Sequence, residues 1–337
     1  MITMKRNAAV LSLLACAGAL LSLVGCGDSG STTSSNSPAP ETKTGAAPKK
    51  YTVGFSQIGA ESAWRTAETK SVQDEAQKRG VTLKFADGQQ KQELQIQAVR
   101  SFIAQKVDVI FLAPKVETGW EPVLREAKRV NIPVILLDRG IKVSDDSLYK
   151  TLLTSDFVEE GRMAANWLAK RMNGKGNIVE LQGTVGSAPA NDRKQGFAEV
   201  LAKFPDMKVT RSQTGDFTIA KGKEVMEAFL KADPTIQAVY AHNDDMALGA
   251  AQAIEEAGKK PGKDIILVSI DGVHQALEAI KDGKLNCSVE CNPLLGPGAF
   301  DAAEQILAGK DVPKRIVSKD QQFDESTAAQ ALPTRKY

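Results

Sequence analysis

From Tyr51 onward, short apolar runs rich in β-branched residues alternate with longer amphipathic segments. The short runs are typical of buried strands, and the longer segments have the spacing of helices. This alternation predicts βαβ units, in which parallel strands form a sheet with helices on both faces. Roughly eight to ten strands over about 285 residues suit two domains better than one. The sequence therefore predicts an α/β fold with two doubly wound parallel-sheet lobes.

The expected strands are short and lie at 52–56, 82–86, 109–112, 133–137, 177–181, 208–213, 238–241 and 265–270. The expected helices lie between them, at 61–79, 90–105, 119–130, 156–172, 190–204, 219–231 and 244–257. The segment 145–153 has no clear crossover helix. We therefore expect the first passage between the two lobes in that segment.

The N-terminus has the features of a secretory leader. Lys5 and Arg6 precede an apolar run, residues 8–25, that ends at Cys26. A charged start, a hydrophobic segment and small residues before a cleavage site are typical of a signal peptide. The ending "LVGC" resembles the lipobox of bacterial lipoproteins, in which the cysteine is acylated and becomes the new N-terminus. An uncleaved membrane helix is the alternative, since the run is close to about 18 residues long.

The segment 27–50 contains no aromatic residue and no aliphatic residue larger than alanine. Such a segment cannot bury a core, so we expect a disordered tether between the leader and the folded body. The leader also carries two of the 43 basic residues, which leaves 41 basic against 41 acidic residues. A nearly neutral chain argues against nucleic acid or an acidic membrane surface as the main partner.

The sequence contains four cysteines, and a different role is expected for the two near the N-terminus than for the other two. Cys16 leaves with the leader, and Cys26 carries the lipid. If the segment 287–291 is a strand, Cys287 and Cys291 lie about 13 Å apart, which is too far for a disulfide bond. We therefore expect Cys287 and Cys291 to be separate, buried thiols.

Polar side chains follow several of the expected strands. They are Glu61, Trp64, Arg65, Asp138, Arg139, Arg193, Asn243, Asp244, Asp271, Glu290 and Asn292. Parallel α/β sheets bind ligands beyond the carboxyl ends of their strands. Some of these residues are expected only to cap the next helix, as Asp244 and, elsewhere, Asp156 would. Helix capping does not explain arginines at three separate strand ends, which favours a binding site.

The residue types suit a neutral polyol. Carboxylates accept hydrogen bonds from hydroxyl groups, and arginines donate in planar pairs. Trp64 or Phe55 would cover the C–H face of a sugar ring. Three arginines balance Glu61, Asp138 and Asp271, whereas a phosphate or carboxylate ligand would leave surplus acids.

An enzyme on this fold is a weaker alternative. The stretches "GPGAFD" and "GKGNIV" lack the third small residue of a dinucleotide-binding loop, and no phosphate-binding loop of the Walker type is present. The stretch "GFSQI" does not match a nucleophile elbow. The chain has two histidines, His242 and His274, which leaves little material for a catalytic triad or a metal site.

Residues 51–326 are similar to the periplasmic sugar-binding proteins of ABC transporters, in the ribose/galactose-binding group. The stretches that carry the resemblance include "VGFSQIGAESAWR", "ADGQQKQ", "TGWEPVL", "VELQGTVG", "DRKQGFAE", "YAHNDDM" and "SIDGV". The resemblance implies two lobes joined by three crossovers, with the sugar clamped between them by hinge closure. It also implies that the sugar contacts Glu61, Arg65, Asp138, Arg139, Arg193, Asn243 and Asp271, with Trp64 and Phe55 flanking it.

The resemblance implies a domain organisation as well. The parts are a signal peptide at 1–25, a tether at 26–50, a first lobe at 51–154 plus 290–317, and a second lobe at 155–289 plus 318–337. The expected protein is a monomer that is anchored through Cys26 in the periplasm or at the cell surface. It would deliver a monosaccharide, with galactofuranose expected foremost, to an ABC permease complex, without a metal or organic cofactor.

The same fold also serves two functions other than transport. Transcription regulators share the ligand core but need an N-terminal helix-turn-helix, and the leader occupies that place. A sugar sensor that docks on a chemoreceptor or a sensor kinase stays open as an alternative. His274, Cys287, Cys291 and Glu290 have no role that the resemblance assigns.

Overall fold

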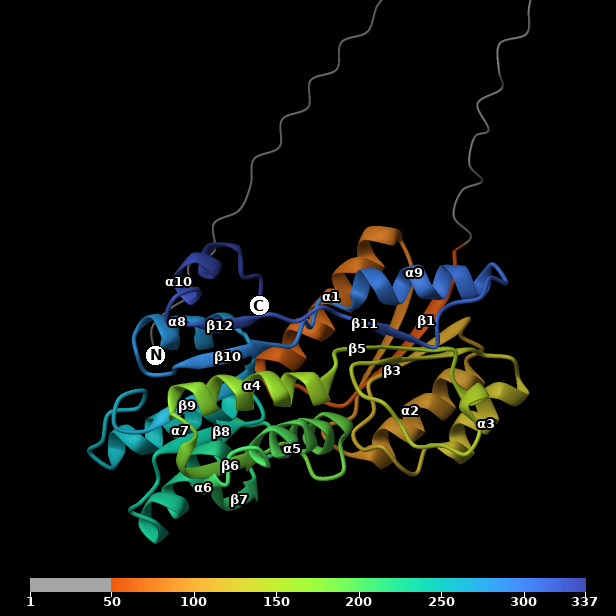
Figure 1. The fold of residues 1–337 in the computed structure, drawn as a ribbon. Helices are drawn as coiled ribbons and strands as arrows, with labels where there is room; N and C mark the ends of the chain where they lie inside the picture. Colours follow the sequence, from red (N-terminus) through yellow and green to blue (C-terminus); the bar gives the residue numbers. More distant parts are fainter. Residues whose placement is uncertain (1–49) are drawn as a thin grey trace, which may run out of the picture. The chain divides into compact units, whose positions relative to one another are not determined.

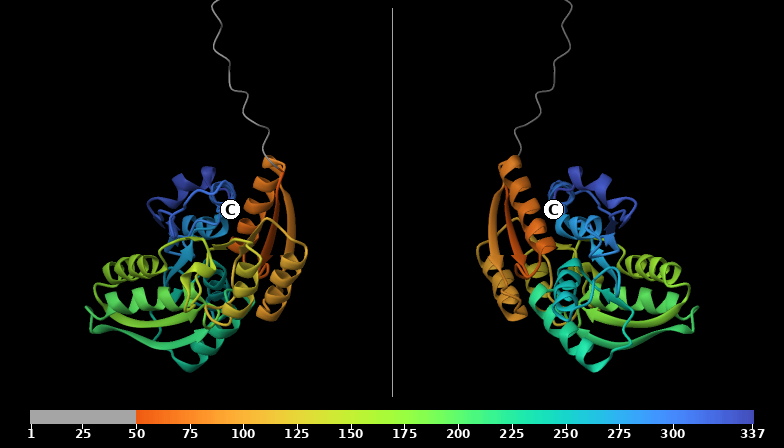
Figure 2. Two further views of the ribbon diagram at one scale, coloured as in Figure 1. Left: turned by 90° about the vertical axis from the view of Figure 1, so that its right-hand side faces the viewer. Right: turned by 90° about the vertical axis from the view of Figure 1, so that its left-hand side faces the viewer.

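The computed structural model of the protein describes residues 50–337, which form two parallel-sheet lobes (Figures 1 and 2). The predicted signal peptide, and the predicted tether up to residue 49, lie outside the described residues. Within residues 50–337, no helix is long and apolar enough to span a membrane.

The first sheet contains six parallel strands in the order β11-β5-β4-β3-β1-β2. Its strands are β1 (Thr52–Gln57), β2 (Thr82–Asp87), β3 (Val109–Leu112), β4 (Val134–Leu137), β5 (Thr151–Thr154) and β11 (Arg315–Val317). Its helices are α1 (Ala63–Arg79), α2 (Gln92–Ala104), α3 (Glu121–Arg129) and α9 (Gly296–Leu307).

Side chains of the first sheet alternate between two hydrophobic clusters, because successive strand residues face opposite sides. Val109 and Phe111 pack with residues of α1 and α9, whereas Ile110 and Leu112 pack with residues of α2 and α3. Helices α1 and α9 lie side by side although they are far apart in the sequence (Figure 1). The first lobe is therefore built from two separate stretches of chain.

The second sheet has the order β12-β10-β9-β8-β6-β7, with only β12 antiparallel to its neighbour. Its strands are β6 (Lys175–Gln182), β7 (Asp206–Thr214), β8 (Ala238–Ala241), β9 (Ile266–Asp271), β10 (Cys287–Glu290) and β12 (Gln322–Asp324). The helices of this lobe are α4 (Phe157–Arg171), α5 (Ala188–Leu201), α6 (Ile219–Ala232), α7 (Asp244–Glu256), α8 (His274–Lys281) and α10 (Ala328–Ala331). Single 3₁₀ turns occur at Asp146–Leu148 and Leu332–Thr334.

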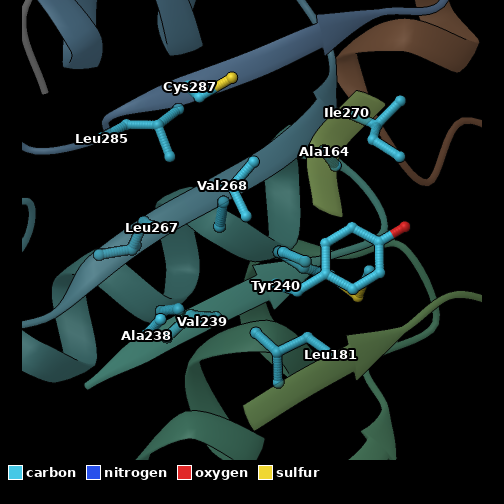
Figure 3. Close-up of a cluster of buried hydrophobic side chains, with 14 of the residues drawn as sticks. Ala164, Leu181, Ala238, Val239, Tyr240, Leu267, Val268, Ile270, Leu285 and Cys287 are labelled. Atoms are coloured by element: carbon cyan, nitrogen blue, oxygen red, sulfur yellow. The ribbon is translucent and has the colours of Figure 1, made fainter. Parts of the chain in front are cut away.

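The core of the second lobe runs along the middle of its sheet. Val239, Tyr240 and Val268 belong to one buried cluster, to which the neighbouring strands β6, β8, β9 and β10 all contribute side chains (Figure 3). Helix α4 packs against α5, and α6 packs against α7. The near-continuous apolar sequence of β8 and β9 follows from burial on both faces of a parallel sheet.

The predicted fold class is confirmed, and the chain crosses between the sheets after β5, β10 and β11. The first crossing follows Thr154 and does not lie within 145–153, because Thr151–Thr154 pairs with β4 as a further strand of the first sheet. Cys287 and Cys291 are separate, buried thiols, as predicted. The lobe boundaries at single-residue level stay a prediction.

Candidate ligand-binding site

A small, tightly lined cavity lies where polar side chains from both lobes meet. Its lining consists of Glu61, Ser62, Trp64, Arg65, Asp138, Arg139, Pro189, Arg193, Phe217, Asn243, Asp271 and Cys291. Eight of these residues were predicted from the sequence to contact ligand. Its volume is about 20 Å³, which is room for about one water molecule.

Three larger hollows lie elsewhere in residues 50–337. One, of about 1020 Å³, is lined by residues at the amino ends of β3, β4 and β5, such as Asp108, Pro133 and Lys150. A second, of about 410 Å³, lies at the amino ends of β6 and β9, and a third, of about 540 Å³, lies beside the last residues of the chain. Ligands of parallel sheets bind at the opposite, carboxyl ends of the strands, where the small cavity lies. We therefore take the small cavity, called the cleft below, as the candidate site.

Arg65 is at the centre of the first lobe's contribution to the cleft. Its Nη2 lies 2.6 Å from Asp138 Oδ2, and its Nη1 lies 2.5 Å from Glu68 Oε2. Its Nε lies 3.3 Å from Glu61 Oε1. Burial acts to lower the pKa of Arg65, but the three carboxylates outweigh burial and raise that pKa above its ordinary value. Arg65 is thus charged and held in one orientation.

Local structure explains this placement. Ser62 caps α1, because its Oγ accepts the N–H of Arg65 at 3.1 Å, so that the first turn of the helix begins at the cleft. Glu68 lies one turn further along α1 and accepts a hydrogen bond from Gln57 Nε2 at 2.9 Å. Glu68 has no role in the sequence prediction, since an acidic residue inside a helix gives no sign of being buried.

Arg139 and Glu61 have unused hydrogen-bonding capacity in the cleft. The Nη1 of Arg139 donates to the Lys115 carbonyl at 3.1 Å, and its Nη2 lies 3.7 Å from Glu61 Oε1. Arg139 Nε and Glu61 Oε2 are buried and have no hydrogen-bond partner among residues 50–337. Burial, followed by repulsion from Arg65, lowers the pKa of Arg139 to about 10. Buried polar atoms without partners are costly, so these two atoms mark where a ligand would bind.

Arg193 is at the centre of the second lobe's contribution. Its Nε lies 2.7 Å from Glu160 Oε2, its Nη1 donates to the His242 carbonyl at 2.6 Å, and its Nη2 lies 3.5 Å from Asp271 Oδ1. Helices α4 and α5 approach closely at this point, where a Cβ on Gly161 would lie 2.3 Å from the Arg193 carbonyl oxygen. Burial raises the pKa of Asp271 well above its ordinary value, although Arg193 opposes that shift.

Two aromatic side chains line the cleft. The indole Nε1 of Trp64 donates to the Cys291 carbonyl at 2.6 Å, and its ring lies 4.7 Å from the guanidinium of Arg65. Phe217 was not predicted, although it follows β7 in the turn-like stretch "TGDFT". The Phe217 ring lies 5.3 Å from the guanidinium of Arg139.

Phe55 is not among the residues that line the cleft, contrary to expectation. It is fully buried in the core of the first lobe, and its ring centroid lies 5.7 Å from that of Phe85. Phe55 lies within β1 and not after its end, and strand alternation directs its side chain into the cluster beneath α1 and α9.

Asn243 lines the cleft, but both of its amide atoms have protein partners. Its Oδ1 accepts the N–H of Met246 at 3.0 Å, and its Nδ2 donates to the Phe217 carbonyl at 3.2 Å. Asn243 is therefore the cap of α7, and the expectation that Asp244 would cap this helix was wrong. Asp244 instead accepts hydrogen bonds from Ser269 and Ser288 inside the lobe.

The other predictions near the cleft have clear outcomes. Asp156 caps α4, as predicted, by accepting the N–H of Glu159 at 3.1 Å. Glu290 and Asn292 line the hollow near the end of the chain and not the cleft. Glu290 pairs there with Arg335 at 2.5 Å.

Comparison with known proteins places this geometry in a family. The chain is 56% identical to the galactofuranose-binding protein YtfQ of Escherichia coli strain K12, over 85% of the chain and 91% of that protein. It is 57% identical to the binding protein of the arabinose ABC transporter from Shewanella sp. ANA-3, solved with α- and β-L-arabinofuranose. That match has a TM-score of 0.83 and covers 85% of the chain and 95% of the other.

A third similar structure is a protein from Mycobacterium smegmatis in complex with β-D-fucofuranose. It is 54% identical, with a TM-score of 0.84, and the match covers 85% of this chain and 95% of that one. A family model described as a periplasmic binding protein domain matches residues 53–311. The chain belongs to the periplasmic binding protein domain family.

Proposed function

We propose that this protein captures a neutral monosaccharide in its furanose form, galactofuranose foremost, and delivers it to an ABC importer. The observation that carries the proposal is a pair of buried atoms in the cleft, Arg139 Nε and Glu61 Oε2, that have no hydrogen-bond partner within residues 50–337. The nearest carboxylate oxygen to Arg139 Nε, Asp138 Oδ2, lies 3.5 Å away and forms an ion pair without a hydrogen bond. Arg139 Nε is a donor and Glu61 Oε2 is an acceptor. A sugar hydroxyl satisfies both kinds of group, because it donates one hydrogen bond and accepts others.

The charge balance of the cleft supports a neutral ligand. Its lining contains three guanidinium groups and three carboxylates, those of Arg65, Arg139, Arg193, Glu61, Asp138 and Asp271. Each of the three arginines lies within 4 Å of at least one of these carboxylates. An anionic ligand would displace these carboxylates from their arginines at a cost of several kcal/mol.

The aromatic groups support a ligand with an apolar face. Trp64 and Phe217 both line the cleft, and both lie next to guanidinium groups. A sugar ring offers hydroxyl groups around its edge and C–H groups on its faces. The polar atoms would hold the hydroxyls, while an aromatic ring would cover the C–H groups and remove them from water.

Direct contacts between the lobes support a mechanism of closure. Glu117 donates its backbone N–H to the Gly186 carbonyl at 3.0 Å, and its carboxylate accepts from Asn191 Nδ2 at 2.7 Å. At a second point, the backbone N–H of Ala63 lies 3.3 Å from the carboxylate of Asp245. A cleft with room for about one water would have to open to admit a sugar. We infer that opening breaks these contacts and that closure around the ligand remakes them.

The relatives favour the furanose form. Arabinofuranose and fucofuranose are bound in two of the similar structures, and the name of the third protein specifies galactofuranose. We also propose that the mature chain is a monomer, is lipidated at Cys26, and is held at the membrane by the tether 26–50. The apolar run before "LVGC" and the polar composition after it support the anchor.

The test is a thermal-shift screen of residues 50–337 against furanoses, their pyranose forms and sugar phosphates, followed by calorimetric titration of the hits. We expect galactofuranose to raise the melting temperature most. Ligand at 100 times its dissociation constant adds about 2.7 kcal/mol to the free energy of unfolding. A melting curve that no sugar moves would overturn the proposal. Recovery of the bound sugar after long incubation separates binding from turnover, since an enzyme would return an altered sugar.

A further inference from the structure

The backbone at the end of β9 has an unusual conformation. Asp271, whose carboxylate lines the cleft, has φ 125°, and Gly272 follows with φ 67°. A non-glycine residue in this region costs about 1–3 kcal/mol and persists only where its surroundings hold it. The direction of the Asp271 carboxylate therefore depends on whatever holds this turn.

Arg335 holds the turn from outside the cleft. Its Nε donates to the Gly272 carbonyl, and its Nη2 donates to the Asp271 carbonyl at 3.3 Å. The Asp271 carbonyl also accepts the N–H of Cys291 at 3.1 Å, and the N–H of Gly272 donates to Ser288 Oγ at 2.9 Å. Among the side chains of residues 50–337, Arg335 alone donates hydrogen bonds to both carbonyls of the turn.

Arg335 is itself firmly placed. Its Nη1 lies 2.5 Å from Glu290 Oε1, and Glu290 also accepts from the Tyr337 hydroxyl at 2.9 Å. The guanidinium lies 4.0 Å from the Tyr337 ring centroid and 4.9 Å from that of Phe323. Its side chain is 8% exposed. Such a group is rigid enough to fix the backbone that it contacts.

The fit between Arg335 and the turn is close. A Cβ at position 272 would lie 2.6 Å from Arg335 Nη2, so the guanidinium occupies space that only a glycine leaves free. Residue 290 is the register partner of residue 271 across β10 and β9. Arg335 therefore ties together the ends of the two strands that flank the turn.

We propose that Arg335 is a positioning residue for ligand binding, which holds the Asp271–Gly272 turn so that the Asp271 carboxylate faces the cleft. This inference rests on the proposed sugar-binding function. Without the two hydrogen bonds from Arg335, the turn relaxes toward an ordinary φ and the carboxylate moves relative to Arg193. Arg335 lies outside the residues 53–311 that the family model matches, and it does not line the cleft.

The alternative is that Arg335 only stabilises the second lobe, and this alternative predicts a different result. In that case, loss of Arg335 weakens the lobe as a whole, and its effect on affinity adds to that of any change at Asp271. If Arg335 acts through Asp271, the two effects overlap. A double-mutant cycle separates these cases, because residues that act through one another are non-additive.

The experiment measures the dissociation constant of galactofuranose for the parent, Arg335→Ala, Asp271→Asn and the double variant. Lys336→Ala is the matched control, since Lys336 is a neighbouring, exposed cation. We expect Arg335→Ala to raise the dissociation constant about tenfold or more, and Lys336→Ala to leave it within about twofold, as for surface changes. In the Asp271→Asn background, we expect the loss of Arg335 to cost less than about threefold.

A second readout needs no ligand. Hydrogen exchange at the amides of Gly272 and Cys291 is expected to quicken in Arg335→Ala, while exchange in the first sheet stays unchanged. Additive effects in the cycle, or unchanged exchange at these two amides, would overturn the inference. If Arg335→Ala does not fold, Arg335→Lys serves in its place, because it keeps the charge beside Glu290 but can reach only one carbonyl. A parent that binds no sugar refutes the proposed function, and the exchange measurement still decides whether Arg335 holds the turn.

Discussion

Arg65 and Asp138 lie 73 positions apart in the sequence, and their side chains meet in the cleft with Nη2 and Oδ2 2.6 Å apart. Both side chains are at most 5% exposed. The pair joins the start of α1 to the end of β4, so the charge and shape of the first lobe's half of the site depend on it. Removal of one partner leaves a buried charge without its counterpart, which is far more costly than loss of a surface pair.

We therefore expect Asp138→Ala to weaken sugar binding by about 2–5 kcal/mol, as measured by calorimetric titration. Asp145→Ala is the control, because Asp145 is a partly exposed carboxylate of the same lobe that pairs with Lys128 away from the cleft. That variant should bind sugar like the parent. If Asp138→Ala binds with an affinity within about threefold of the parent's, the difference in binding free energy is less than about 0.7 kcal/mol. That result would contradict the role of Asp138.

Gly183 packs against the ring of Phe217. A Cβ on Gly183 would come within 1.9 Å of the Phe217 ring, at Cζ. Gly183→Ala should therefore displace the ring from the cleft and raise the dissociation constant about tenfold, while the free protein loses only about 1–3 kcal/mol of stability through overpacking. Gly140→Ala is the matched control, since its nearest neighbouring atom would lie at an ordinary 3.5 Å. Equal affinities of the two variants would rule out Phe217 as a ligand contact.

Asp245 should make the stability of the ligand-free protein fall as pH rises. Burial, aided by repulsion from Asp244 and Glu61, raises the pKa of Asp245 to about 7, although the N–H of Ala63 opposes that shift. The native state therefore keeps a proton that the unfolded chain has lost. Between about pH 4 and about pH 7, the free energy of unfolding falls by up to about 1.4 kcal/mol per pH unit for such a group.

Asp245→Asn should reduce this slope in urea unfolding measured at several pH values. In the control Asp145→Asn, the slope in this window should not change. The pKa of Asp145 is lowered to about 2, mainly by hydrogen bonds from Ser147 and Lys128. The contribution of Asp145 is therefore lost only as pH falls below about 4. A slope in Asp245→Asn that equals the parent's would show that Asp245 ionises normally in the native state.

Cys26→Ala should release the full-length protein from the membrane fraction, because the lipid on Cys26 is the proposed anchor. Cys16→Ala, within the predicted leader, should leave the protein membrane-bound. Fractionation followed by immunoblotting measures both. Retention of Cys26→Ala in the membrane fraction would instead support the uncleaved helix.

Several features of the fold were predictable because they depend on local periodicity. The eight expected strands all occur, with ends shifted by at most two residues, and most of the polar residues named after them meet in the cleft. Strands β5, β11 and β12 were not predicted as strands. They have three or four residues each, and unlike the four-residue strands β3, β4 and β8 they are not apolar throughout. Helix α9 begins with "GPG", a stretch that argues against a helix, but Pro297 is tolerated in its first turn.

The amino-acid sequence by itself determined the alternating α/β pattern and the charged residues that follow the strands, and it predicts a leader. Only the tertiary structure decided which of these residues share a cavity and what holds them. Phe55 belongs to the core, because it lies within β1 and helices cover both faces of that sheet. Phe217 lines the cleft from the turn after β7, where no local period indicates which way a side chain points. Arg335 reaches Asp271 across 64 positions of sequence, and such a contact exists only once the separate segments have packed together.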